Sequence, residues 1–157
     1  MAEGELKLRP DYYTAMDLVA QQYEDTATMW YFYHALREEN KLVTTRCKSC
    51  GHIPWPPRQI CPECLSTDYE WVDMPKRGKI YSWTAAYAGM PPELQSRAPI
   101  VYALVDFDNG LRMPTAILEC KPEEARTGME VELVVHDVQP DLYGRRRVAP
   151  YFKPVGR

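Results

Sequence analysis

Apolar side chains recur at helical spacing in the first part of the chain, between residues 10 and 42. In the first half of this region they fall on one helical face, at Tyr12, Met16, Val19 and Tyr23. In the second half another set has the spacing i, i+3, i+4, i+7, at Met29, Phe32, Tyr33 and Leu36. We therefore expect two helices, with Asp25 or Thr26 as the N-cap of the second and Asn40 at its end.

From residue 69 onward the pattern changes to the two-residue period of β-strands. We expect strands at residues 69–72, 79–84, 100–107, 112–118, 131–135 and 148–153. Asn109-Gly110 suits the two positive φ angles of a hairpin turn, and Gly128 ends a single helical turn predicted to start at Pro122. Pro150 breaks the last segment and makes it resemble an edge strand. This order predicts a small Greek-key barrel of the OB type, with an SH3-like barrel as the alternative.

Four cysteines stand between the helical and the β-rich parts, as two C-x-x-C pairs that follow a short predicted strand at residues 42–46. They are Cys47, Cys50, Cys61 and Cys64. Each pair can form a tight turn that points two thiolates at one ion, and two such turns give the tetrahedral sulfur ligation of a structural zinc site. Because four sulfur ligands leave no open coordination position, we expect the metal to be structural rather than catalytic.

Other chemistry for these cysteines stays open at this stage. Iron also accepts four thiolates in this geometry, as in rubredoxin, and would make the protein an electron carrier. Disulfides would need an oxidising compartment, and the acidic N-terminus, Met1 to Glu5, does not resemble a signal peptide. A redox C-x-x-C motif is more typical as a single copy near a βαβ unit. We therefore expect a zinc-binding, cytoplasmic protein.

Composition narrows the class of protein. The chain has 157 residues, of which 45% are hydrophobic and 26% are charged, as in a globular domain. No apolar stretch is long enough to span a bilayer, so no membrane partner is expected. The formal net charge is −3, and a zinc ion with four thiolates would bring it to roughly −5. This acidic balance makes nucleic acid an unfavoured partner, although zinc ribbons and OB-folds both bind single strands in other proteins.

The predicted fold is mainly β with N-terminal helices. We expect an N-terminal helical segment at residues 1–42, a rubredoxin-like zinc ribbon at residues 43–70 and a small OB-fold Greek-key barrel at residues 71–157.

Several longer motifs resemble a known family. They are Leu42 to Gly51, Pro56-Pro57-Arg58, Cys61 to Cys64, Gly78 to Thr84, Ala98 to Val105, Gly128 to Val131 and Pro150 to Pro154. Together they are similar to the acyl-CoA-associated zinc-ribbon/OB-fold family, long labelled a domain of unknown function, over residues 28–154. The chain departs from that pattern at Leu65, where many relatives carry glycine, and in a longer N-terminal extension.

The resemblance implies an accessory subunit of a hetero-oligomer. Members of this family are typically bound to thiolase-type subunits, and sometimes to hydratases or aldolases that act on acyl-CoA. The thiolase supplies the catalytic cysteine and histidines, and the small subunit helps to shape the site for CoA and acyl-CoA. Within the family, the long aromatic N-terminus is similar to the small subunits of benzoylsuccinyl-CoA thiolase, from anaerobic toluene breakdown.

A CoA-facing surface would carry basic side chains, because CoA has anionic phosphates. The candidates are Lys76, Arg77, Lys79, Arg97, Arg145, Arg146 and Arg147. Each cluster can equally be solvated loop charge.

Aromatic side chains in the predicted helices and the ribbon loop are candidates for a partner interface, because Trp and Tyr are enriched at interfaces. These candidates are Trp30, Tyr31, Tyr33 and Trp55. The alternative is that the rings pack on the rest of this chain.

The residues themselves assign no catalytic group. There is no phosphate loop, nucleophile elbow or H-E-x-x-H motif. Cys120 has no supporting motif for a nucleophile and is expected to be an inert thiol. Whether the chain has an activity of its own is left open.

Overall fold

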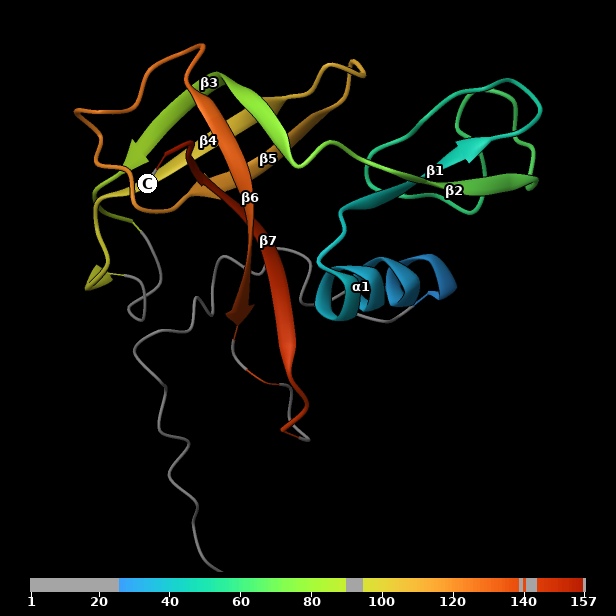
Figure 1. Ribbon diagram of the computed structural model, residues 1–157, viewed down its shortest axis with the longest axis horizontal. Helices are drawn as coiled ribbons and strands as arrows, with labels where there is room; N and C mark the ends of the chain where they lie inside the picture. The colour runs from blue at the N-terminus through green and yellow to red at the C-terminus, as the bar shows by residue number, and fades with distance from the viewer. Residues whose placement is uncertain (1–25, 90–94, 139, 141–143, 157) are drawn as a thin grey trace, which may run out of the picture.

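A computed structural model describes residues 26–89, 95–138, 140 and 144–156. Within these ranges the chain forms one helix and seven strands (Figure 1). The elements are α1 (Ala27–Glu39), β1 (Val43–Cys47), β2 (Tyr69–Asp73), β3 (Arg77–Ala86), β4 (Ile100–Asp106), β5 (Arg112–Ile117), β6 (Glu130–Val138) and β7 (Arg147–Pro154). The first predicted helix, with Tyr12 to Tyr23 on its apolar face, lies outside the described residues. No helix among the described residues is long and apolar enough to cross a membrane.

Helix α1 begins and ends where its capping residues predict. The Thr26 hydroxyl accepts a hydrogen bond from the Met29 amide at 3.2 Å, which satisfies a free donor of the first turn. Asn40 is in the left-handed conformation, with φ 52°, and ends the helix. The predicted apolar face is buried, including Leu36, which is 0% exposed. The second predicted helix is therefore confirmed, and its apolar face packs on this chain.

Strands β1 and β2 form a separate two-stranded antiparallel sheet that carries the cysteine loops (Figure 1). Two buried threonines of β1 hold the loop between the cysteine pairs. The Thr44 hydroxyl donates to the Pro54 carbonyl, and the Thr45 hydroxyl lies 3.0 Å from both the carbonyl and the amide of Arg58. These bonds satisfy the buried hydroxyls and fix the loop against the sheet.

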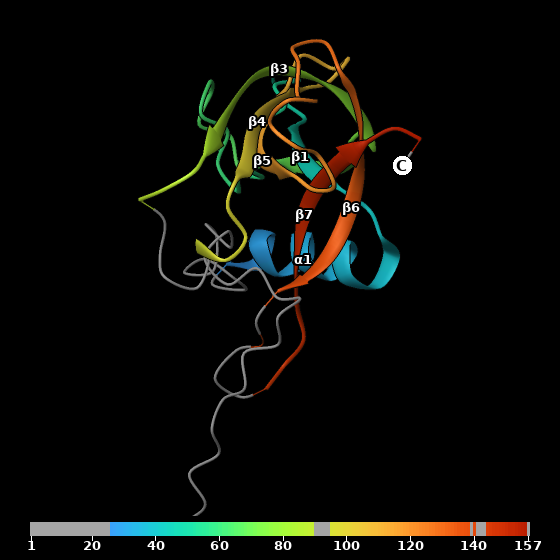
Figure 2. The same cartoon turned by 90° about the vertical axis from the view of Figure 1, so that its left-hand side faces the viewer.

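The five remaining strands close into a barrel with the order β3-β4-β5-β7-β6 (Figure 2). Neighbouring strands are antiparallel except for β5 and β7, which pair in parallel at Ile117 and Phe152. Because β7 lies between β5 and β6, the strand order departs from the chain order, as in a Greek key. The predicted OB-type barrel behind a four-cysteine region is confirmed.

The prediction that the last segment is an edge strand is wrong. Strand β7 pairs with β6 from Arg147 to Pro154 and closes the barrel against β5. The Pro150 carbonyl accepts a hydrogen bond from the Thr115 hydroxyl of β5 at 3.1 Å. A residue in a strand directs its N–H and C=O to the same side, so the donor that proline lacks would face β5. Since β5 and β7 pair only near Ile117, no ladder hydrogen bond is lost there.

A continuous apolar core connects the helix to the barrel. It runs from Leu36 of α1 through Met74, which precedes β3, to Phe152 of β7. Strand β3 comes very close to β4 at Gly78. A Cβ atom at position 78 would lie 2.5 Å from Val105 Cγ1 and 2.7 Å from the Asp106 carbonyl oxygen. Only glycine therefore fits at this position without a shift of the neighbouring strand.

Candidate functional site

The two C-x-x-C turns have the same backbone geometry. In each, the residue after the second cysteine donates its amide to the carbonyl of the first cysteine: Gly51 to Cys47 at 2.8 Å, and Leu65 to Cys61 at 3.0 Å. Both residues are left-handed, with φ 77° at Gly51 and φ 61° at Leu65. The same turn therefore forms whether glycine or leucine follows the second cysteine.

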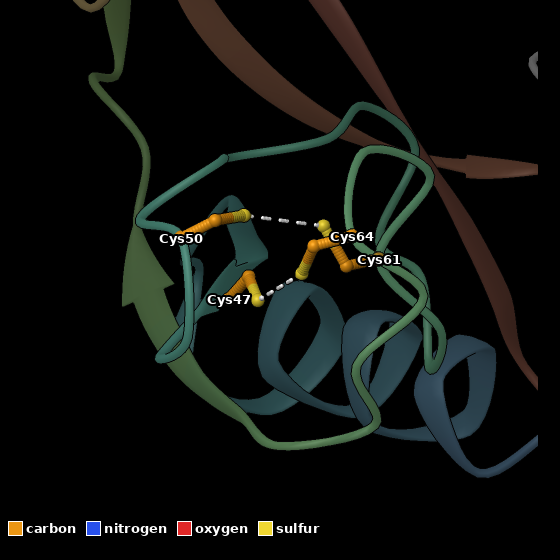
Figure 3. A group of neighbouring side chains, drawn as sticks. All are labelled: Cys47, Cys50, Cys61 and Cys64. Atoms are coloured by element: carbon orange, nitrogen blue, oxygen red, sulfur yellow. Dashed lines mark hydrogen bonds between the residues drawn. The ribbon is translucent and has the colours of Figure 1, made fainter.

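The four sulfur atoms converge between the two turns (Figure 3). All four lie within 4.8 Å of one another, and the pairs Cys47–Cys64 and Cys50–Cys61 are each 3.6 Å apart. Zinc–sulfur bonds of about 2.3 Å in a tetrahedron place sulfur atoms about 3.8 Å apart. A disulfide would need about 2.05 Å, and all four cysteines are free thiols. The spacing therefore fits one metal ion held by both turns.

The ionisation of the four thiols also favours a bound cation. The Cys50 amide, which donates to the Cys47 sulfur, lowers the pKa of the Cys47 thiol to about 6. The His52 amide acts in the same direction on Cys50, but the neighbouring Cys64 sulfur and desolvation outweigh it and raise the pKa of Cys50 to about 12. One thiolate thus opposes the ionisation of the next. A divalent ion removes this opposition, so the donor set supports a structural zinc ion.

Replacing Leu65 with glycine should stabilise the second turn. A left-handed residue with a Cβ costs about 1 kcal/mol, and the Leu65 side chain is largely exposed, so little packing is lost. We expect Leu65→Gly to raise the free energy of unfolding of the zinc-loaded protein by about 1 kcal/mol in urea denaturation.

Gly51→Ala is the reciprocal control. A Cβ at position 51 would meet no atom within 4 Å, so only the φ angle is tested, and stability should fall by about 1 kcal/mol. A loss of stability in Leu65→Gly would contradict this account of the second turn.

A second feature is a cleft of about 670 Å³ between α1, the loop of the ribbon and the barrel strands β3, β4, β5 and β7. Its walls come from six segments that are distant in sequence. Its lining residues are Met29, Phe32, Trp55, Pro56, Pro57, Ser82, Trp83, Thr84, Tyr102, Ala103, Leu104, Arg112, Met113, Pro114, Thr115, Ala116, Ala149, Pro150 and Tyr151. Arg112 is the one charged side chain in this set, and no cysteine, histidine or carboxylate belongs to it.

Arg112 is held in place from two sides. Its Nε donates to the Asp106 carboxylate at 2.9 Å, and its guanidinium carbon lies 3.6 Å from the centre of the Tyr81 ring. The hydrogen bond to Asp106 raises the pKa of Arg112, so the side chain stays cationic. Sequence reasoning missed this residue because it stands alone rather than in a basic run. The available signal was the hairpin turn, which pairs Arg112 with Asp106 across β4 and β5.

The predicted CoA-facing cations do not line this cleft. Lys76 and Arg77, with Lys79, stand exposed around the start of β3, and Arg77 forms a salt bridge with Glu132 at 3.3 Å. They therefore form a surface of their own at another part of the barrel.

The other predicted cations lie at two further places. Arg97 lines a smaller pocket of about 390 Å³ together with Cys120. The run Arg145-Arg146-Arg147 leads into β7, and Arg146 forms a salt bridge with Asp137 at 2.8 Å. Among the described residues, the three basic clusters thus belong to different segments of the chain.

The predicted interface aromatics have different environments. Tyr33 is 0% exposed, so its proposed role as a surface contact is wrong: its ring belongs to the apolar core. Tyr31 is partly buried, with its ring centre 4.5 Å from that of Trp71. Trp30 is half exposed, and Trp55 lines the cleft.

Other exposed aromatics were not singled out from the sequence. Along and just after β3, Tyr81, Trp83 and Tyr87 are 49%, 37% and 65% exposed. A register shift between Ile80 and Ser82 disturbs the alternation of inward and outward positions. The strict two-residue period therefore could not place these rings.

Two family models match consecutive parts of the chain: the ChsH2 rubredoxin-like zinc ribbon domain at residues 34–70, and the ChsH2 C-terminal OB-fold domain at residues 71–136. A DUF35 domain-containing scaffold protein of Methanocaldococcus jannaschii is 34% identical over 124 residues, which are 76% of this chain and 86% of that protein.

Two further relatives carry functional names. The benzoylsuccinyl-CoA thiolase subunit BbsA of Thauera aromatica is 31% identical over 110 residues, which are 70% of this chain and 74% of BbsA. The solved structure of an Ltp2-ChsH2(DUF35) aldolase contains a chain that is 29% identical with a TM-score of 0.67, covering 80% of this chain and 92% of that one. The chain described here therefore belongs to the DUF35 family, in which a ChsH2-type zinc ribbon precedes an OB-fold.

Proposed function

We propose that this chain is an accessory, zinc-stabilised subunit of a cytoplasmic thiolase-type complex, in which it docks on the catalytic subunit and helps to shape the acyl-CoA site. Its similarity to a thiolase subunit and to a chain of an aldolase complex supports a catalytic partner of this kind. Benzoylsuccinyl-CoA, named in the BbsA relative, is the candidate substrate of such a complex.

The chemistry of the cleft carries this proposal. The cleft can bind an apolar group, but its lining offers no pair of nucleophile and base for acyl transfer. The four sulfurs of the cysteine cluster complete a tetrahedral metal site and leave no position for a substrate. Both features fit a subunit that binds and positions while a partner catalyses.

The exposed rings of Tyr81, Trp83 and Tyr87 are the proposed contact with the catalytic subunit. Large exposed aromatics are typical of interface anchors. These three lie along and just after β3, beside the cleft, which Trp83 also lines. Trp30 on α1 offers a further exposed ring.

An affinity pulldown from native extract, with the tag at the C-terminus, tests the proposal. A stoichiometric thiolase-type protein, identified by mass and active in CoA-dependent cleavage, is the expected result. The double variant Trp83→Ala/Tyr87→Ala should weaken its binding by about tenfold or more, whereas Ile60→Ala, another exposed apolar residue, should not. Recovery of nucleic acid, or of no protein, would overturn the proposal.

The basic clusters are the proposed contacts for the nucleotide end of acyl-CoA. If the run at residues 145–147 serves this purpose, reversing Arg145, Arg146 and Arg147 to glutamate should raise the KM of the complex for acyl-CoA by about tenfold, because attraction to phosphate becomes repulsion. The KM should be measured by steady-state kinetics on the purified complex.

An N-acetylcysteamine thioester of the same acyl group is the matched control substrate. It lacks the nucleotide phosphates, so its KM should stay unchanged in the triple variant. An unchanged KM for acyl-CoA would remove this cluster from the proposed site.

A further inference from the structure

We infer that the 670 Å³ cleft itself binds an aromatic ring carried on an anionic chain, so that the acyl group of the substrate is held partly by this accessory chain. This assignment of the ligand to the acyl group rests on the proposed function, whereas binding by the cleft does not. The three observations that carry it are the size of the cleft, the nature of its walls and the position of its one charge.

The size and construction of the cleft are those of a small-molecule site. Such sites measure about 300–1,000 Å³ and are lined mostly by apolar groups with a few polar ones. Here the volume is about 670 Å³, and the polar side chains apart from Arg112 are hydroxyls, such as Ser82, Thr84 and Thr115. Because α1, the ribbon loop and four barrel strands all contribute, the cleft forms only once the whole chain is folded.

The walls favour a ring over a flexible aliphatic chain. Five aromatic side chains line the cleft: Phe32, Trp55, Trp83, Tyr102 and Tyr151. Offset or edge-to-face contacts between rings contribute about 0.5–1.5 kcal/mol beyond burial of their area. Four prolines in the same lining, at positions 56, 57, 114 and 150, add flat and rigid surfaces.

Several of these walls are fixed before any ligand binds. The Trp55 ring stands edge-on to Phe32, with ring centres 5.6 Å apart and an interplanar angle of 69°. Phe32 is 3% exposed within the core, and Thr44 anchors the backbone next to Trp55 through the Pro54 carbonyl. Walls that need no reordering lose less entropy on binding.

The positive charge of Arg112 at the cleft favours an anionic ligand. Arg112 is cationic, and besides the Nε–H that it donates to Asp106 and its contact with Tyr81, its planar guanidinium carries further donors. A carboxylate on the chain that carries the ring can accept from these donors while the ring rests among the aromatic walls. Asp106, the salt-bridge partner of Arg112, does not belong to the described residues that line the cleft, and no other carboxylate does.

Binding should be measured on the zinc-loaded full chain with 4-phenylbutanoate as the probe. Two of the four tryptophans, Trp55 and Trp83, line the cleft, so intrinsic fluorescence reports occupancy directly. A ligand of this size should bind with a Kd of about 1 mM. 4-Cyclohexylbutanoate, with a saturated ring, should bind about fivefold more weakly, and the neutral 4-phenylbutanamide should also lose about fivefold.

Variants then locate the site. Trp83→Ala should weaken the binding of 4-phenylbutanoate by about fivefold, and the fluorescence of Trp55 still reports this binding. Thr84→Tyr fills the cleft from an exposed strand position and should abolish binding. Tyr87→Ala, which lies outside the cleft but within the proposed docking surface, should leave binding unchanged.

The outcomes separate this inference from the proposed function. Equal affinity for the phenyl and cyclohexyl probes would overturn the preference for an aromatic ring. No saturable binding, or binding that Thr84→Tyr leaves intact, would overturn the site itself, even if the chain still captured a thiolase-type protein. Binding that follows the expected order supports the site even if the partner proves to be of another class.

Discussion

Replacing Cys61 with serine should strip the protein of zinc and unfold the ribbon. The three remaining thiolates cannot complete the tetrahedral site, in which Cys61 lies 3.6 Å from Cys50. Structural zinc contributes about 10–16 kcal/mol of apparent binding free energy in zinc-finger peptides, and this energy is also folding energy. We therefore expect the free energy of unfolding to fall by more than about 4 kcal/mol, measured by urea denaturation with metal content determined in parallel.

Cys120→Ser is the matched control, since it makes the same atomic change away from the cluster. It should retain one zinc ion per chain and change stability by less than about 1 kcal/mol. Full metal content in Cys61→Ser would contradict the four-sulfur site. Visible absorbance with bound iron in the wild-type protein would replace zinc by the rubredoxin-type alternative.

Truncating Leu36 to alanine should destabilise the whole chain, including the barrel. Leu36 is 0% exposed and belongs to the core that continues through Met74 to Phe152. Removing a buried leucine side chain costs about 2–5 kcal/mol, because the apolar contacts are lost and a cavity remains. We expect a loss of about 3 kcal/mol in urea denaturation, with one transition in both far-ultraviolet and near-ultraviolet circular dichroism.

Trp30→Ala on the exposed side of the same helix is the control. Its side chain is half exposed, so the expected loss is below about 1 kcal/mol. If Leu36→Ala also lost less than about 1 kcal/mol, the helix would not share a cooperative core with the barrel. A first transition confined to the helix would lead to the same conclusion.

Local sequence signals predicted the elements of this fold well. The helix at Ala27–Glu39 was predicted from the spacing of its apolar residues. Its capping residues, Thr26 and Asn40, stand directly before and after it in the sequence. The cysteine turns follow from C-x-x-C spacing, because the chain between the two thiols is too short for another arrangement. The second turn forms even with leucine at position 65, since the metal ligands Cys61 and Cys64 fix the backbone on its N-terminal side.

Contacts between distant segments could not be read in this way. The cleft joins α1, the ribbon loop and four strands, and no local pattern indicates that Trp55 and Trp83 line one surface. Tyr33 and Trp30 lie on one helix, and only the position of the barrel decides which ring is buried. Strand β7 can lie inside the barrel because the side of Pro150 that lacks an N–H points toward β5. A single sequence does not specify this orientation.

The close approach of β3 to β4 at Gly78 also limits how this protein can vary over generations. Any other residue at that position must displace the Asp106 carbonyl or Val105. Every missense change in the glycine codon thus meets the same obstacle, whatever the chemistry of the new side chain. Gly89, with open space around it, offers selection no such obstacle beyond its φ angle. Heritable change in this protein should therefore avoid position 78 and be accepted more readily at loop positions such as Gly89.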